Sequence, residues 1–265
     1  MVIGQSDSGK TAFARYLFQE LCRLHSRVGF LDCDMGQSTL GPPTTMTLAL
    51  SALGGPTFPP RGKVVSYFVG STSPRGHMLP TVIGAYKLQR RAQELGAEAI
   101  VVDTTGLVAQ QMGGGELKQW KIELLQPSTL VGIERGAELE HILWPWRWDR
   151  RVRVYELPVC EYVTEKSRTE RISYRERRFR HHFEEAHNLE VPLGKIVAFG
   201  MDRMTGNRLL ALQDEWGFAL ALGVAKDYDR NIQTLAVTTP LPSLDGVSSI
   251  RFGSLKLDPT TGREL

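Results

Sequence analysis

Short apolar runs alternate with helical patterns along the first part of the chain. Val28–Asp32 and Ala99–Asp103 have the composition of buried strands, and Thr81–Leu95 between them has the periodicity of a helix. Thr129–Ile133 and Val152–Leu157 have the pattern of two further strands. Since strands that alternate with helices form parallel sheets, the pattern predicts an α/β fold, with a mostly parallel sheet and helices on both faces.

The pattern changes after residue 190. Five short apolar runs follow, separated by Gly, Asp, Asn and Pro turns, with no helical segment between them. This predicts a small β-rich C-terminal domain over 191–265, either a barrel or a sandwich, after a larger domain over 1–190. The runs are Ile196–Phe199, Arg208–Leu212, Phe218–Val224, Thr234–Val237 and Ile250–Gly253.

A glycine-rich segment lies at the start of the chain. Gly4–Thr11 fits the pattern G-x-x-x-x-G-K-[ST], with the apolar Met1–Ile3 before it and a helical pattern over 12–17 after it. Such a loop turns backbone N–H groups toward a polyphosphate, while Lys10 reaches the phosphates and the Thr11 hydroxyl holds Mg²⁺. We therefore expect a fold of the P-loop NTPase type that binds a nucleoside triphosphate. The predicted nucleotide-binding residues are Gly4, Gln5, Ser6, Asp7, Ser8, Gly9, Lys10, Thr11 and Ala12.

Acidic residues follow two of the predicted strands. Asp32 and Asp34 stand at the carboxyl end of the second strand, where open α/β sheets bind ligands, and strand alternation points them the same way. One could help hold Mg²⁺ while the other accepts a proton from an attacking hydroxyl; an Asx-rich turn is the alternative. Asp103 is expected to orient metal-bound water, and Gly106 to let the backbone approach the γ-phosphate. The predicted metal ligands are Thr11, Asp34 and Asp103.

A basic stretch runs from Lys166 to Arg180. Seven of its fifteen residues are Lys or Arg, and only Glu170 and Glu176 oppose them. On a helix, four of the arginines fall at i, i+3, i+7 and i+10, which makes one face that could clamp phosphates; a solvated surface is the alternative. These four are Arg168, Arg171, Arg175 and Arg178.

Composition narrows the class of protein. Among 265 residues, 42% are hydrophobic and 23% charged, and no apolar run approaches the length of a membrane span, which predicts a soluble, cytoplasmic protein. The three cysteines lack C-x-x-C spacing, so neither a disulfide framework nor a zinc site is expected. The aromatic cluster Trp144–Trp148 could stack nucleobases, although packing at a domain junction is the preferred interpretation.

In their order along the chain, these motifs resemble those of the polynucleotide 5′-hydroxyl kinases. The resemblance rests on Gly4–Thr11, the D-x-D-x-G-Q segment Asp32–Gln37, Tyr67–Pro74, Asp103–Gly106 and the arginine-rich stretch, and it covers nearly the whole chain. The family includes the kinase subunit of the pre-mRNA 3′-end cleavage factor and the pre-rRNA-processing kinases. It implies ATP and Mg²⁺ as cofactors and transfer of the γ-phosphate to a 5′-hydroxyl end of RNA or DNA.

The resemblance also implies roles for single residues. Lys10 and Asp34 are implied to be catalytic, Asp34 as the general base. Arg171 and Arg175 match the R-x-x-x-R of a lid, about 164–188, that closes over the triphosphate. The implied substrate-binding residues are Asp32, Gln37, Ser71, Thr72, Ser73, Thr105, Gly106, Arg168 and Arg178.

The sequence departs from the family in two respects. Leu107 stands where the family often has Trp, so we expect the first nucleotide to be held by phosphate and sugar contacts rather than by base stacking. Family members typically begin with a further β-domain, whereas only Met1–Ile3 precede Gly4 in this sequence.

Two other functions are compatible with parts of the sequence. A nucleotide-hydrolysing switch or assembly factor would also use Asp103–Gly106, but the base-reading N-K-x-D of GTPases is absent. A non-catalytic nucleic-acid-binding module would not need Lys10, Thr11 and Asp34 together. The motifs leave open the choice between RNA and DNA, the pathway, and any protein partner.

Overall fold

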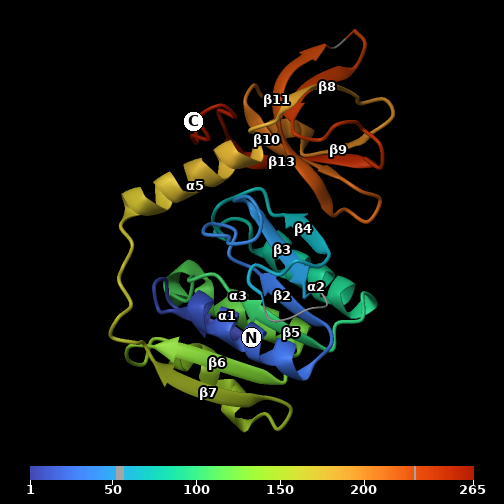
Figure 1. Ribbon diagram of the computed structural model, residues 1–265. Helices are drawn as coiled ribbons and strands as arrows, with labels where there is room; N and C mark the ends of the chain where they lie inside the picture. The colour runs from blue at the N-terminus through green and yellow to red at the C-terminus, as the bar shows by residue number, and fades with distance from the viewer. Residues whose placement is uncertain (52–56, 230) are drawn as a thin grey trace. The chain divides into compact units, whose positions relative to one another are not determined.

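In the computed structural model, the first part of the chain builds a mostly parallel sheet (Figure 1). Its strands are β1 (Val2–Gly4), β2 (Val28–Asp32), β3 (Thr45–Leu50), β5 (Ala99–Asp103), β6 (Thr129–Glu134) and β7 (Arg153–Pro158). Five of them run parallel in the order β7-β6-β1-β5-β2, and β3 pairs with β2 in the antiparallel direction. The carboxyl ends of the five parallel strands therefore share one edge of the sheet.

Helices connect these strands and cover both faces of the sheet. α1 (Lys10–Leu24) links β1 to β2, so the chain moves across the sheet from β1 past β5. α2 (Met78–Glu94) precedes β5 and α3 (Gly114–Leu125) precedes β6, so with these helices the chain moves back across the sheet in the opposite direction. Because such crossovers are right-handed, α1 lies on one face and α2 and α3 pack together on the other. Shorter turns are η1 (Gln110–Met112), α4 (Glu140–Leu143) and η2 (Trp144–Trp148).

The C-terminal part begins with a long basic helix and continues as strands. The helix is α5 (Arg168–His182), and the strands are β8 (His187–Pro192), β9 (Val197–Phe199), β10 (Arg208–Gln213), β11 (Ala219–Asp229), β12 (Thr234–Thr239) and β13 (Ser249–Lys256). They pair in the order β8-β12-β11-β10-β13-β9, antiparallel except for β13 with β9. The η3 turn (Met201–Arg203) follows β9.

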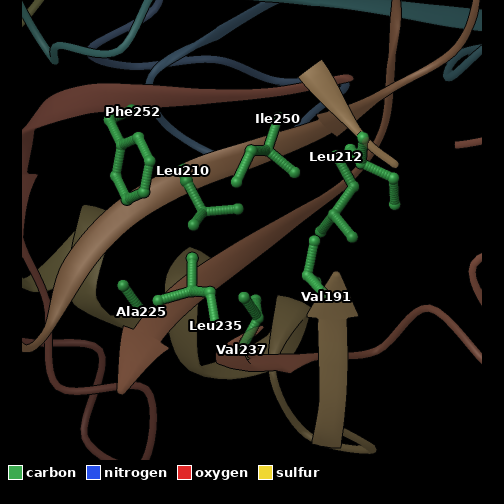
Figure 2. Packing of buried hydrophobic residues seen from close by; sticks show 9 residues of the cluster. Val191, Leu210, Leu212, Ala225, Leu235, Val237, Ile250 and Phe252 are labelled. Carbon is green, nitrogen blue, oxygen red and sulfur yellow. The ribbon is translucent and has the colours of Figure 1, made fainter. Parts of the chain in front are cut away.

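Strand β10 is buried on both faces, which explains its unbroken apolar sequence. Leu210 and Leu212 point into a cluster with Val191 of β8 and Ile250 of β13 (Figure 2). Its alternate residues, among them Leu209, pack in a second cluster with Phe179 and Phe183 at the end of α5. Since period-two alternation places neighbouring residues on opposite faces, β10 joins the strand core to the helix.

The residues that the structure describes are 1–51, 57–229 and 231–265, and they divide into two compact units. The first unit holds 1–40, 46–65 and 73–166, and the second holds 41–45, 66–72 and 167–265. The strand β4 (Val64–Phe68) ends in the second unit, where Ser66 pairs with Ala219 of β11. No helix among the described residues is both long and apolar enough to cross a bilayer.

The structure confirms the predicted α/β fold with a C-terminal β-domain, including the strands Val28–Asp32 and Ala99–Asp103 to the residue. The sequence did not predict β3, which is buried along its whole length, or the largely polar β8. The units also differ from the sequence-based domains 1–190 and 191–265, because α5 packs into the second unit through Phe179 and Phe183.

Candidate active site

The phosphate loop connects β1 to α1 and has the geometry of an anion site. Gly9 caps α1 with a φ of 84°, in the left-handed region that favours glycine, and no side chain caps the first turn of the helix. The uncapped N–H groups and the positive end of the helix dipole are therefore available to phosphate oxygens. Lys10 is 6% exposed, and its amino group donates to the carbonyl of Gln5 within the loop.

A hydroxyl and a carboxylate meet at the foot of this loop. Thr11 Oγ1 donates to Asp103 Oδ2 across 2.7 Å, and Asp103 Oδ1 is buried without a hydrogen-bond partner in the described part of the chain. Burial, and next the carboxylate of Asp32, raise the pKa of Asp103 to about 7. A divalent cation would offset the cost of burying the ionised Asp103 carboxylate and its repulsion by Asp32. Hard oxygen donors of this kind suit Mg²⁺. Thr11 and Asp103 therefore fit the metal-binding role predicted for them.

Asp32 organises the loop that follows β2. Its carboxylate is 1% exposed and accepts hydrogen bonds from the Thr39 amide at 2.7 Å, the Ser38 hydroxyl at 3.1 Å and the Asp34 amide at 3.0 Å. Burial raises the pKa of Asp32 in spite of these donors. Its burial and its hydrogen-bond partners give Asp32 a part in ordering this loop, and they argue against the substrate contact that the resemblance implies for it.

The two carboxylate oxygens of Asp34 differ in their hydrogen bonds. Oδ1 accepts hydrogen bonds from the amides of Gly36 and Gln37, each at 3.0 Å, whereas Oδ2 has no hydrogen bond to any described residue. The side chain is half-buried, and Gln37 beside it donates from Nε2 to the carbonyl of Gly36. A carboxylate fixed through one oxygen and open at the other is suited to accept a proton.

The segment Asp103–Gly106 packs directly against the phosphate loop. The Thr104 hydroxyl donates to the carbonyl of Val2 at 2.8 Å, which ties the segment to β1. A Cβ atom at Gly106 would lie 2.6 Å from the amide nitrogen of Ser6, so only glycine allows this approach. The segment after β5 therefore forms one wall of the site around the loop.

A second set of contacts at the loop was not predicted. Arg135, directly after β6, donates from Nη2 to the carbonyl of Asp7 at 2.8 Å and lies 3.7 Å from Glu165. The Asp7 carboxylate accepts from the amide of Lys166 at 3.1 Å. The segment that leads to α5 is thus fastened to the phosphate loop. An arginine after a strand belongs to no motif, so no sequence signal could have identified Arg135.

The predicted lid arginines lie on α5, in the second unit. Arg175 forms an ion pair with Glu264 at 2.8 Å, and Arg178 donates to the carbonyl of Gly41 at 2.6 Å. Arg168 is exposed, and Arg171 is half-buried. Ser71 and Thr72 also belong to the second unit, whereas Ser73 belongs to the first. The roles of these residues toward a substrate at the phosphate loop stay predictions.

The tryptophan cluster is divided by burial. Trp146 is buried and donates from Nε1 to Gln119 of α3 at 3.0 Å, so it packs inside the first unit. Trp144 and Trp148 are 53% and 75% exposed, with ring centroids 6.1 Å apart. Trp146 therefore packs against α3 within one unit, and not at the domain junction that the sequence analysis preferred.

A family model and individual relatives both match this chain. The family described as mRNA cleavage and polyadenylation factor CLP1 P-loop matches residues 4–185. The chain is 28% identical to the polyribonucleotide 5′-hydroxyl-kinase of Methanocaldococcus jannaschii, over 100% of this chain and 88% of that protein. It is 27% identical to the polyribonucleotide 5′-hydroxyl-kinase of Pyrococcus abyssi, over 97% and 87% of the two chains.

A solved structure extends the similarity to the fold. Wild-type Clp1p, determined in complex with residues 454–563 of Pcf11p, superposes with a TM-score of 0.70. The superposition covers 96% of this chain and 73% of that chain, at 12% sequence identity. At this identity the likeness concerns the arrangement of the elements.

Proposed function

We propose, from the premise that this chain belongs to the mRNA cleavage and polyadenylation factor CLP1 P-loop family, that it is an ATP-dependent polynucleotide 5′-hydroxyl kinase. The observation that carries the proposal is the position of three groups along one sheet edge. These are the phosphate loop after β1, the open carboxylate oxygen of Asp34 after β2, and the Thr11–Asp103 pair beside β5. A site of this kind can hold a triphosphate and accept a proton from its attacker.

In the proposed reaction, Asp34 is the general base. The 5′-oxygen of the acceptor bonds to the γ-phosphorus while the bond from that phosphorus to the β–γ bridging oxygen breaks, and ADP leaves. The proton of the hydroxyl passes to Asp34 Oδ2. The Gly36 and Gln37 amides on Oδ1 keep the carboxylate oriented for this transfer.

The loop residues bind and neutralise the phosphates. The amides at the start of α1 hold phosphate oxygens, and Lys10 exchanges its contact with Gln5 for one to the transferred group. Thr11 and Asp103 would hold Mg²⁺, which would neutralise negative charge on the phosphates. A nearby cation would favour the ionised form of the buried Asp103, whose pKa is raised by burial.

The lid and the acceptor contacts complete the proposal. Arg171 and Arg175 act on the γ-phosphate when the lid closes, which requires Arg175 to leave Glu264. RNA is the proposed acceptor, because the two archaeal relatives are named for polyribonucleotides. The proposed acceptor contacts are Gln37, Ser71, Thr72, Ser73, Thr105, Gly106, Arg168 and Arg178.

The second candidate is an ATPase switch or assembly factor, which the wall around Gly106 would also suit. Parallel measurement of phosphate release and phosphate transfer separates the two. With a 5′-hydroxyl oligoribonucleotide in excess, the proposal predicts that ATP consumed equals phosphate transferred. Release of inorganic phosphate at a rate that the oligonucleotide does not change would identify the switch instead.

A further inference from the structure

Two lysines are buried on the face of α3 that points toward the sheet. Lys118 and Lys121 are each 0% exposed and stand one helical turn apart. Lysine is almost never fully buried unless it is paired, because removing its charge from water is costly. A helix pattern alone would place both side chains in solvent, so their burial calls for a specific reason.

The two lysines differ in what they contact. Lys118 Nζ donates to the carbonyl of Thr105 at 2.6 Å and lies 3.3 Å from the Thr105 hydroxyl. Burial, and next the neighbouring Lys121, hold the pKa of Lys118 well below its usual range, yet the amino group donates in either protonation state. Lys121 Nζ has no hydrogen-bond partner among the described residues. Of these two lysines, Lys118 is therefore the one that fastens α3 to the wall of the active site.

The wall is held at three successive points. Before Thr105, the Thr104 hydroxyl donates to the carbonyl of Val2 at 2.8 Å. After it, His141 Nε2 donates to the carbonyl of Val108 at 2.9 Å. Lys118 holds the middle point, and the next residue along, Gly106, is the one that packs against Ser6 of the phosphate loop. A shift at Thr105 would therefore be passed directly to the loop that holds the transferred phosphate.

We propose that Lys118 is a positioning residue for phosphoryl transfer, whose amino group holds the Thr105 carbonyl so that Gly106 stays seated against Ser6. The proposal rests on the proposed kinase function for its effect on rate, but the seating itself does not. A misplacement of about 1 Å in such a site can cost on the order of 100-fold in rate. ATP affinity depends mainly on the loop and helix amides, which Lys118 does not touch.

The test compares Lys118→Met with the matched control Lys121→Met. Both changes replace a buried amino group by a side chain of similar length on the same helix, but only the first removes a hydrogen bond. We expect Lys118→Met to lower kcat by about 10- to 100-fold with the KM for ATP within about threefold. Lys121→Met should keep kcat and unfold at a higher temperature, because it removes an unsatisfied buried polar group. Equal kcat losses in both variants, or normal kcat in Lys118→Met, would overturn the proposal.

A second readout needs no catalysis. Amide hydrogen exchange over 104–108 should become faster in Lys118→Met and stay unchanged in Lys121→Met. If the wild-type protein transfers no phosphate, the kinase function fails while this comparison still decides the seating role. Lys118→Gln, which keeps an N–H donor, should recover part of the protection and of kcat, and it serves as the test variant if Lys118→Met does not fold. No recovery in a folded Lys118→Gln together with unchanged exchange in Lys118→Met would contradict the proposal.

Discussion

Thr11 Oγ1 lies 2.7 Å from Asp103 Oδ2, and this hydrogen bond joins the first turn of α1 to the end of β5. The other oxygen of the carboxylate is buried and has no hydrogen-bond partner in the described residues. Mg²⁺ in nucleotide sites is usually bound by one or two protein oxygens together with substrate phosphates. Thr11 and Asp103 can therefore supply the protein oxygens of such a metal site, and the substrate phosphates supply others.

Replacement of Asp103 by Asn should raise the Mg²⁺ concentration for half-maximal activity by about 10- to 100-fold. In the wild type, protonation of Asp103 competes with the metal, so the Mg²⁺ requirement should rise as pH falls through about 7. The variant should lack this pH dependence. Magnesium titrations at several pH values provide the measurement. Asp149→Asn is the control, since it removes a half-buried carboxylate that pairs with the exposed Arg151. A metal requirement that is unchanged in Asp103→Asn would remove Asp103 from the site.

Asp34→Asn should lower the transfer rate by on the order of 100-fold or more, because an amide keeps the contacts of Oδ1 but accepts no proton. ATP binding, measured by titration calorimetry, should change little. Asp32→Asn provides the comparison: it disturbs the loop hydrogen bonds and should chiefly lower the unfolding temperature. A loss of ATP affinity in Asp34→Asn would instead make Asp34 a metal ligand.

The phosphate loop could be predicted from the sequence because a short motif contains all of its determinants. The neighbouring acids could not be distinguished in this way. Their position at the carboxyl end of β2 predicted that Asp32 and Asp34 lie near the site. Only the path of the following loop shows that the Thr39 amide and the Ser38 hydroxyl donate hydrogen bonds to Asp32. The same limit applies to Lys118, since its burial depends on where α3 packs.

The double replacement of Arg171 and Arg175 by Ala should reduce kcat by on the order of 100-fold. It should weaken ATP binding far less. The matched control is Arg177→Ala with Arg180→Ala, which removes the same charge from the exposed face of α5. The control should lose less than about threefold at saturation, because exposed cations contribute mainly to salt-dependent association. Equal losses in the two double variants would make α5 a general phosphate-binding surface rather than a lid.

His182 should make the stability of the protein sensitive to acid. Its Nε2 accepts a hydrogen bond from the Leu222 amide, and burial lowers the pKa of His182 from 6.5 to about 4. The unfolded chain therefore binds a proton more readily than the folded chain between these values. Stability from this group is complete above pH 6.5 and falls as pH drops toward 4, by up to about 3 kcal/mol.

Urea unfolding of the wild type and of His182→Gln across pH 4 to 7 tests this dependence. The difference between the two proteins isolates His182, because the contribution of Asp103 is common to both. The free-energy difference should be largest near neutral pH and shrink under acid. A difference that stays constant with pH would show that His182 does not titrate as its burial implies.

The C-terminal unit shows which strands local patterns can predict. Runs such as Arg208–Leu212 are apolar because β10 is buried on both faces, and they were predicted. β8 was missed because its burial is confined mainly to Val191, so its sequence looks like a polar loop. The edge pairing of β8 with β12 is a tertiary property that no short window contains.

The central claim is most directly tested by transfer of labelled γ-phosphate from ATP to matched oligoribonucleotides that carry either a 5′-hydroxyl or a 5′-phosphate. Digestion of the product to mononucleotides locates the label. We expect the label on the 5′-terminal nucleotide of the 5′-hydroxyl substrate alone, and its loss in Lys10→Ala by on the order of 100-fold or more. Label found only as inorganic phosphate, with either oligonucleotide, would contradict a 5′-hydroxyl kinase.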